Sequence, residues 1–359
     1  MSKKIIFGIV GGGWRSQFYL RVVKALPEQF EISGIVVRNE TKGIKIEKEW
    51  GVKTYRTINE LLNASIPEFV VVAVPRDAAS SITKQLVEHD IPVLSETPPA
   101  QDTNDLIELN NFIKKNNGKI QIAEQYHLQP LHAARISFVN TGKLGEISEV
   151  MISVCHEYHA ISLIRKFLGV GFENATIMAC EFSSKLVEPD DYILPTSEKI
   201  TNSNRILAKL DFGGKVGIYN FAYEQYFSWI RSPHLLVRGS RGEIFDDHIS
   251  YLKDFKNPIY LDLKRQNAGE NGNLEGYYLK GILAGEEWIY KNKYVPSRLT
   301  DDEIAIASCL DKMDEYVKSG KSFYDLAEAS QDHYLALMII NAYKSKETIV
   351  TEKQPWALS

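Results

Sequence analysis

Residues 4–16, KIIFGIVGGGWRS, join a short apolar run to three consecutive glycines. The run Lys4–Val10 is typical of a buried strand, and Gly11-x-Gly13-x-x-Ser16 has the spacing of a phosphate-binding glycine loop with Ser as its third small residue. The first Gly allows a tight turn, and the second lets a pyrophosphate approach the backbone. A helix starting here would offer free N–H groups to the phosphates. The alternative is a purely structural turn, but the surrounding pattern favours dinucleotide binding.

Strand and helix patterns alternate around this loop from about residue 3 to residue 124. The expected strands are Lys4–Val10, Ile32–Val37, Phe69–Val74, Ile91–Leu94 and Lys119–Ala123. The expected helices are Phe18–Leu26, Lys45–Trp50, Leu61–Asn63, Ala78–Glu88 and Asn104–Asn116. Such alternation indicates βαβ units and a parallel sheet. We therefore predict an α/β chain whose first domain, residues 1–124, is a dinucleotide-binding Rossmann domain.

The pattern changes after residue 124, where strand-like segments dominate. One helix, Leu131–Thr141, precedes the expected strands Glu149–Val154, Thr176–Phe182, Ile206–Phe212, Lys215–Tyr223, His234–Gly239, Gly242–Asp246 and Ile249–Phe255. Helices are then expected over Tyr277–Lys291, Asp301–Ser319 and Ser322–Lys346. Alternating apolar and polar positions favour a large, mostly antiparallel, open sheet. Residues 125–359 are thus predicted to form an α+β domain for substrate binding and oligomerisation.

Composition excludes several classes of protein. The 359 residues are 44% hydrophobic and 25% charged, as in ordinary globular proteins, and carry a formal charge of −4. This mildly acidic balance argues against nucleic-acid or anionic-membrane partners. Three scattered cysteines are too few for a disulfide framework and favour a reducing, cytoplasmic location. We expect no signal peptide and no membrane span.

The end of the second expected strand bears on the choice of cofactor. An NAD site usually places a carboxylate there to hold the ribose 2′-OH, but this chain has Arg38, with Lys42 shortly after. Arg38 could pair with a 2′-phosphate or stack on adenine, and its alternative role is an ordinary surface Arg. Arg38 and Lys42 therefore predict NADP in preference to NAD, while Trp14 and Arg15, beside the glycine loop, are further predicted cofactor-binding residues.

Several further segments resemble the glucose–fructose oxidoreductase/inositol dehydrogenase (Gfo/Idh/MocA) oxidoreductases. They are FGIVGGG (7–13), FVVVAVP (69–75), IPVLSETPPA (91–100), AEQYHLQP (123–130), GKLGEI (142–147) and INAYKSKETIV (340–350). Their order and spacing span nearly the whole chain. The resemblance implies NAD(P)-linked hydride transfer on sugar-like or polyol substrates, with Pro75, Glu96 and Gln125 near the cofactor.

The chain departs from this family at its catalytic positions. The family's Glu-Lys-Pro is Glu96-Thr97-Pro98 here, so a hydroxyl replaces the Lys ammonium. The family's D-x-G-x-H-x-x-D segment corresponds to residues 155–162, in which only His159 is kept, while Cys155 and Ser162 occupy the Asp positions. We therefore describe the chain as a divergent member of the family that lacks the lysine.

His159 is the predicted general acid/base, because imidazole exchanges protons near neutral pH and His159 matches the family's catalytic His. Thr97 is placed near the nicotinamide, and Tyr158 is a possible helper in proton transfer. Substrate contacts are predicted for Tyr126, His127 and His156. For His159 the alternative is a structural, hydrogen-bonded histidine at a helix start. His156 and His159 are spaced i, i+3 rather than i, i+4, so no metal site is expected.

Two functions remain open on the sequence. The first is an NAD(P)-dependent oxidoreductase acting on CH–OH groups of a small molecule. The second is a dinucleotide-binding sensor or regulatory protein that has lost redox catalysis, and redox-neutral chemistry through transient oxidation is a third variant. An exposed sheet face would be costly in a monomer, so a homodimer or homotetramer is expected.

Overall fold

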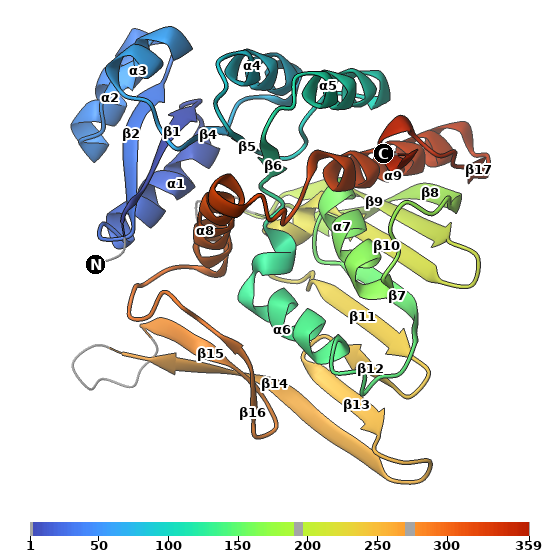
Figure 1. Ribbon diagram of the computed structural model, residues 1–359. Coiled ribbons are helices and arrows are strands. Elements are labelled where there is room, and N and C mark those ends of the chain that lie inside the picture. The colour runs from blue at the N-terminus through green and yellow to red at the C-terminus, as the bar shows by residue number, and fades with distance from the viewer. Residues whose placement is uncertain (1–2, 190–196, 270–276, 359) are drawn as a thin grey trace. The chain divides into compact units, whose positions relative to one another are not determined.

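The computed structural model describes residues 3–189, 197–269 and 277–358. The chain folds into two compact units, each built from several segments (Figure 1). One comprises residues 1–132, 265–281 and 291–330, and the other comprises residues 133–264, 282–290 and 331–359. The chain thus returns to the first unit after it has built most of the second.

A six-stranded parallel sheet forms the centre of the first unit. Its order is β3-β2-β1-β4-β5-β6, and the predicted parallel Rossmann-type sheet is confirmed. The strands are β1 (Ile5–Val10), β2 (Phe30–Val36), β3 (Thr54–Tyr55), β4 (Phe69–Val72), β5 (Val93–Ser95) and β6 (Ile120–Ile122). The strand order reverses at β1, which lies between β2 and β4. In open α/β sheets, ligands bind at the carboxyl ends of strands beside such a reversal.

Helices between these strands begin where the sequence supplies a cap. They are α1 (Trp14–Ala25), α2 (Glu40–Trp50), α3 (Ile58–Ala64), α4 (Arg76–Glu88) and α5 (Thr103–Lys115). Asn39, Thr57 and Asp102 accept backbone N–H bonds at the starts of α2, α3 and α5, respectively. A late helix, α8 (Asp301–Ser319), begins with a capping box from Thr300 to Glu303 and packs on α1.

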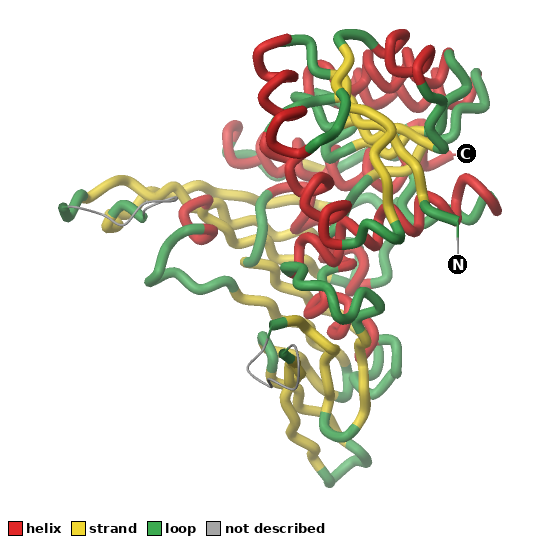
Figure 2. Tube along the Cα trace, turned by 90° about the vertical axis from the view of Figure 1, so that its left-hand side faces the viewer, coloured by secondary structure: helices red, strands yellow, loops and turns green. Residues whose placement is uncertain are grey.

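The second sheet has eleven strands in the order β16-β15-β14-β13-β12-β11-β7-β10-β9-β8-β17. They are β7 (Ile147–Ser153), β8 (Thr176–Val187), β9 (Ile200–Asp211), β10 (Val216–Ala222), β11 (His234–Gly239), β12 (Gly242–Phe245), β13 (His248–Leu252), β14 (Pro258–Ala268), β15 (Tyr278–Ala284), β16 (Glu287–Lys291) and β17 (Ile349–Val350). Figure 2 draws the strands in yellow and the helices in red. From β14 to β17 in this order, neighbouring strands are antiparallel except β7 and β10, so the predicted mostly antiparallel sheet is confirmed.

The remaining helices are α6 (Pro130–Val139), α7 (Glu157–Leu168) and α9 (Leu326–Ser345), with short 3-10 turns η1 (Tyr126–Leu128), η2 (Tyr223–Tyr226) and η3 (Pro355–Leu358). Helix α7 packs on β7 and β10 of the second unit. Its Arg165 forms a buried ion pair with Asp332 of α9, in which Nη1 lies 2.6 Å from Oδ1. The two side chains are 2% and 3% exposed, so α7 and α9 are joined by a charge pair shielded from water.

The predicted helix over Tyr277–Lys291 is wrong. This segment forms strands β15 and β16, joined by the two residues Gly285 and Glu286, and Gly285 has φ +61°. A glycine with positive φ is typical of a tight hairpin turn. Gly281 and Gly285 weaken the helix, and the pairing of both strands into the sheet outweighs the helical spacing of their apolar residues.

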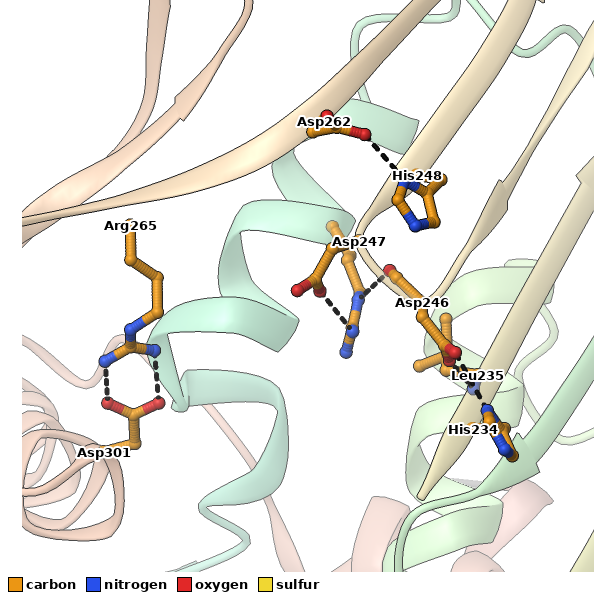
Figure 3. A network of polar contacts seen from close by, with 9 residues as sticks. His234, Leu235, Asp246, Asp247, His248, Asp262, Arg265 and Asp301 are labelled. Carbon is orange, nitrogen blue, oxygen red and sulfur yellow. Dashed lines mark hydrogen bonds and ion pairs between the residues drawn. The ribbon is translucent and has the colours of Figure 1, made fainter. Parts of the chain in front are cut away.

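Two polar pairs connect the β12–β13 hairpin to the flanking strands β11 and β14 (Figure 3). His234 Nδ1 lies 2.8 Å from Asp246 Oδ2, and His248 Nδ1 lies 2.6 Å from Asp262 Oδ1 on the next strand. The hydrogen bond and charge of Asp262 raise the pKa of His248. Within the first unit, Arg265 forms a two-bond pair with Asp301, both distances being 2.8 Å.

Candidate functional site

The glycine loop follows β1 and closes tightly on β4. Gly11 has φ +122°, and a Cβ at that position would lie 2.0 Å from the backbone oxygen of Ala73. Only glycine fits this turn. Ser16 is buried, and its hydroxyl donates a 2.8 Å bond to the Gly11 carbonyl. The Ser in place of a third glycine therefore stabilises the loop while remaining small enough for the close packing.

Gly13 leaves open space at the start of α1. A Cβ at Gly13 would meet no atom within 4 Å, and its φ of −78° is accessible to any residue. Helix α1 has no side-chain cap and no acidic residue in its first turn. The first N–H groups of a helix have no intrahelical partner, and the helix dipole favours negative charge there. The loop therefore has both the space and the donors that a pyrophosphate requires.

Arg15, Tyr19 and Glu96 form a polar cluster beneath this loop. Glu96 follows β5, and its Oε1 accepts bonds from Arg15 Nε at 2.8 Å and from Tyr19 OH at 2.5 Å. Burial alone would lower the pKa of Arg15, but the neighbouring Glu96 carboxylate raises it on balance. Burial, and then the Glu96 charge, raises the pKa of Tyr19 well above its usual range. Arg15 is thus a fixed cation and Tyr19 a neutral donor at neutral pH.

Some polar atoms of the first unit are buried without a hydrogen-bond partner in the described part of the chain. Arg15 Nη2 and Gln125 Oε1 are two of them, and Gln125 is only 6% exposed. Buried polar groups in proteins normally have a hydrogen-bond partner. Together with the space at Gly13, these atoms fit a bound dinucleotide, to which Arg15 would offer a cation and Gln125 an acceptor.

The other residues predicted near the cofactor are more exposed. Trp14 is 71% exposed and packs edge-on against Phe18, and Pro75 precedes the first residue of α4. Arg38 and Lys42 are exposed, with no side-chain hydrogen bond or ion pair in the described segments. These two cations are therefore not neutralised by a neighbouring carboxylate of the described chain.

Three predicted reaction or substrate residues also belong to the first unit. Thr97 follows Glu96 and is partly exposed. Tyr126 and His127 lie on η1, where the ring of His127 stacks on Tyr324 with centroids 5.1 Å apart. All three residues thus lie on short segments that follow parallel strands.

The second unit brings together His156, Tyr158 and His159 at the start of α7. The ring centroids of His156 and His159 are 5.1 Å apart, and those of Tyr158 and His159 are 4.5 Å apart. His159 is 6% exposed, whereas His156 is partly exposed. Tyr158 also meets His333 of α9 edge-on at 5.7 Å. The predicted residues therefore fall into two groups, one in each unit.

Cys155, Glu157 and Ser162 occupy the positions where the resembling family keeps Asp, Gly and Asp. Cys155 is fully buried, and the buried Ser162 hydroxyl donates to the His159 carbonyl at 3.1 Å. Neither supplies a carboxylate. Glu157, at the family's Gly position, has φ +41°, a left-handed conformation unusual for a side-chain-bearing residue.

Two tyrosines that sequence reasoning did not place in the site hold this helix start. Tyr226 OH lies 2.7 Å from His156 Nδ1 and accepts the His156 backbone N–H at 3.0 Å. Tyr219 OH accepts the Glu157 N–H at 3.2 Å, and burial raises the pKa of Tyr219. The only sequence signal was an aromatic-rich segment, which gives no partner for either hydroxyl.

No cluster of three or more His, Cys, Asp or Glu side chains suited to a metal ion occurs within residues 3–189, 197–269 and 277–358. In the same residues, every helix is too short or too polar to span a bilayer.

The comparisons with known proteins fit a dinucleotide-binding oxidoreductase fold. Residues 5–124 match the family GFO_IDH_MocA, described as an oxidoreductase family with an NAD-binding Rossmann fold. YteT of Bacillus subtilis (strain 168) is 23% identical over 173 residues. That alignment covers 44% of this chain and only 40% of the length of this curated relative.

Solved structures share the fold over nearly the whole chain. An NAD-binding oxidoreductase from Klebsiella pneumoniae has a TM-score of 0.71 at 13% identity and covers 98% of this chain and 100% of its own. An oxidoreductase from Agrobacterium radiobacter, in complex with NAD+, L-tartaric acid and magnesium, has a TM-score of 0.68 at 14% identity (97% and 98% covered). The WlbA dehydrogenase from Bordetella pertussis, in complex with NADH and UDP-GlcNAcA, has a TM-score of 0.65 at 14% identity (98% and 100% covered).

The glycine loop and the parallel sheet thus define a Rossmann-fold first domain, and residues 5–124 match an NAD-binding oxidoreductase family. The resemblance to the Gfo/Idh/MocA oxidoreductases is confirmed, with the family match covering residues 5–124.

Proposed function

We propose that this protein transfers a hydride between a nicotinamide dinucleotide and a small sugar- or polyol-like substrate, at a CH–OH group or the matching carbonyl. The observation that carries the proposal is the pair of imidazoles, His156 and His159, 5.1 Å apart in the segment where the family keeps its proton-transfer residues. The Bordetella and Agrobacterium structures named above contain a sugar nucleotide and a hydroxy acid, which supports a hydroxylated substrate.

Carbonyl reduction needs a hydride at carbon and a proton at oxygen. The nicotinamide ring of a bound dinucleotide would supply that hydride. His159 is the proposed proton donor, because its imidazole can give and regain a proton near neutral pH. Tyr158, whose ring lies 4.5 Å from that of His159, would orient the imidazole, and Thr97 would donate a hydrogen bond to a substrate oxygen. Tyr126, His127 and His156 are proposed to bind the substrate.

The cofactor is proposed to be held by the glycine loop, with Gly11 and Gly13 at the pyrophosphate. Arg15, Glu96 and Gln125 would line the same site. Arg38 and Lys42, exposed at the end of β2 and the start of α2, favour NADP over NAD, because a 2′-phosphate would meet cations rather than a carboxylate. Direct titration with NADPH and NADH tests this choice, and tighter binding of NADH would refute it.

A turnover screen tests the main proposal. The protein is loaded with NADPH or NADH and exposed to keto-sugars, keto-inositols and keto acids, and cofactor oxidation is followed at 340 nm. At least one carbonyl should be reduced, and His159→Gln should abolish that reduction while it leaves cofactor binding unchanged. His248→Gln, an exposed histidine on β13, is the matched control and should behave like the wild type. Full activity of His159→Gln would remove His159 from the mechanism.

A dinucleotide-binding sensor without redox activity is the alternative. It is favoured by Cys155 and Ser162, which replace the family's two Asp residues with groups that carry no charge at neutral pH. Such a protein would bind the cofactor in the same titration and oxidise none of it across the whole panel.

Two further proposals concern the assembly and its location. Strands β8 and β9 expose the apolar side chains Met178, Phe182 and Leu207, and covering them in a homodimer or homotetramer would remove apolar surface from water. Light scattering after size exclusion would test this, and a monomer at micromolar concentration would contradict it. The small number of cysteines, three in the whole chain, supports a reducing cytoplasmic location, which fractionation of the source cells would check.

A further inference from the structure

A single phenol hydroxyl holds two groups of His156 at once. Tyr226, the last residue of η2, places its OH 2.7 Å from His156 Nδ1 and 3.0 Å from the His156 backbone N. The two residues are 70 positions apart in the sequence and lie in the same unit. Both the side chain and the backbone of His156 are therefore fixed by Tyr226.

The hydrogen bonds of Tyr226 OH bear on the tautomer of the His156 imidazole. A phenol oxygen has one hydrogen to donate and can accept other bonds. The backbone N–H can only donate, so it occupies an acceptor position of Tyr226. If the phenol hydrogen is then donated to Nδ1, that nitrogen carries no proton, and the proton of a neutral imidazole lies on Nε2.

The partial positive charge at the start of a helix favours a neutral imidazole at His156 over a charged one. His156 is the N-cap residue of α7, a helix of 12 residues. His159 lies close by, and two neighbouring imidazoles are not readily both charged. Three tyrosine rings contact His156, and they belong to Tyr158, Tyr223 and Tyr226. Cys155 and Glu157 are its neighbours in the chain, and Tyr219 of β10 binds the Glu157 backbone. His333 contacts the far side of this group through Tyr158.

We propose that Tyr226 is a positioning residue that holds His156 as the neutral Nε2–H tautomer, so that His156 donates a hydrogen bond to a substrate oxygen and leaves proton exchange to His159. The part of this inference that concerns the reaction rests on the proposed function. The tautomer is a property of the resting protein and can be measured without turnover.

Nitrogen NMR of the full-length protein, labelled with 15N-histidine, tests the tautomer. The His156 signals, assigned by their loss in His156→Gln, should show an unprotonated Nδ1 and a protonated Nε2 from about pH 6 to pH 8. In Tyr226→Phe the His156 nitrogens should move toward averaged tautomer values. A protonated Nδ1 of His156 in the wild type would overturn the proposal, whether or not Tyr226→Phe folds.

Kinetics separate a positioning role from a purely structural helix cap. Tyr226→Phe should lower kcat/KM by about tenfold, the effect of one lost hydrogen bond, and should shift the pH profile assigned to His159. Tyr251→Phe, on β13 and away from this cluster, is the matched control and should change neither. An unaltered pH profile in a folded, active Tyr226→Phe would contradict the positioning role. Correct tautomers without turnover of any carbonyl would support the tautomer assignment and contradict the proposed function instead.

Discussion

Filling the open space at Gly13 should remove dinucleotide binding without unfolding the protein. A side chain at Gly13 would meet no atom within 4 Å and needs no change of backbone, so Gly13→Ala and Gly13→Val should fold. The expected loss of stability is about 1 kcal/mol or less, because Ala and Val are poorer N-cap residues than Gly. The added methyl groups would instead occupy the space through which a pyrophosphate approaches the first N–H groups of α1.

The size of the binding loss follows from those N–H groups. Hydrogen bonds to a charged group contribute about 1.5 kcal/mol or more each, so the loss of two weakens binding by about 3 kcal/mol, or roughly 100-fold in Kd. Fluorescence titration with NADH and NADPH measures this, and Gly13→Ala should fall between wild type and Gly13→Val. Gly171→Val, in the second unit, controls for the added side chain, because a Cβ at Gly171 would make only an ordinary 3.5 Å contact with Glu173 Oε2. A folded Gly13→Val that binds either cofactor as tightly as the wild type would refute the assigned pyrophosphate position.

Three other perturbations follow from named contacts. Asp332→Asn should destabilise the second unit by about 3–5 kcal/mol in urea denaturation, because it leaves the Arg165 cation buried without its counter-charge; a loss below 1 kcal/mol would contradict this. The pKa of His248 should be above its unfolded value of about 6.5 and should return toward it in Asp262→Asn, as followed by proton NMR. Since the pKa of His248 is raised in the folded state, its pair with Asp262 stabilises the fold below pH 6.5. This stabilisation is lost as the pH rises through the pKa of the folded state, and an unshifted His248 pKa would exclude it. Arg38→Ala should weaken NADPH binding about tenfold and leave NADH binding within a factor of two, whereas equal losses would show that Arg38 does not contact a 2′-phosphate.

The first sheet could be predicted because its signals are local. The run Ile5–Val10 ends at Gly11, whose positive φ and close approach to Ala73 are the physical demands that the glycine spacing expresses. The alternating helices and strands then leave few arrangements other than a parallel sheet. The same local logic correctly predicted helix α8, whose capping box is visible as Thr300 and Glu303.

The hairpin of β15 and β16 was missed because its stability is not local. The segment contains good helix formers such as Leu283 and Glu287, and propensity alone favours a helix. Its strands are stabilised by pairing with the rest of the sheet, and Gly285 at the turn was the one signal that could have indicated this.

Only part of the candidate site could be predicted from the sequence. His159 and Tyr158 were found through a motif in one short segment, and the structure places their rings in contact. Tyr226 contributes through a contact that joins residues 70 positions apart, for which no spacing rule exists. Tyr19 was likewise missed, although it follows Arg15 by one helical turn and donates to the same Glu96 oxygen. The roles of these residues and the domain boundary at residue 124 remain predictions.

The most direct test of the proposed hydride transfer uses nicotinamide cofactor deuterated at C4. The protein is incubated with each deuterated C4 epimer and with the carbonyl compound that supports cofactor oxidation, and the product is analysed by mass spectrometry. The account predicts a product one mass unit heavier from one epimer only, and no labelled product with His159→Gln. Cofactor that binds at the glycine loop but passes no deuterium to any carbonyl of the panel would contradict it.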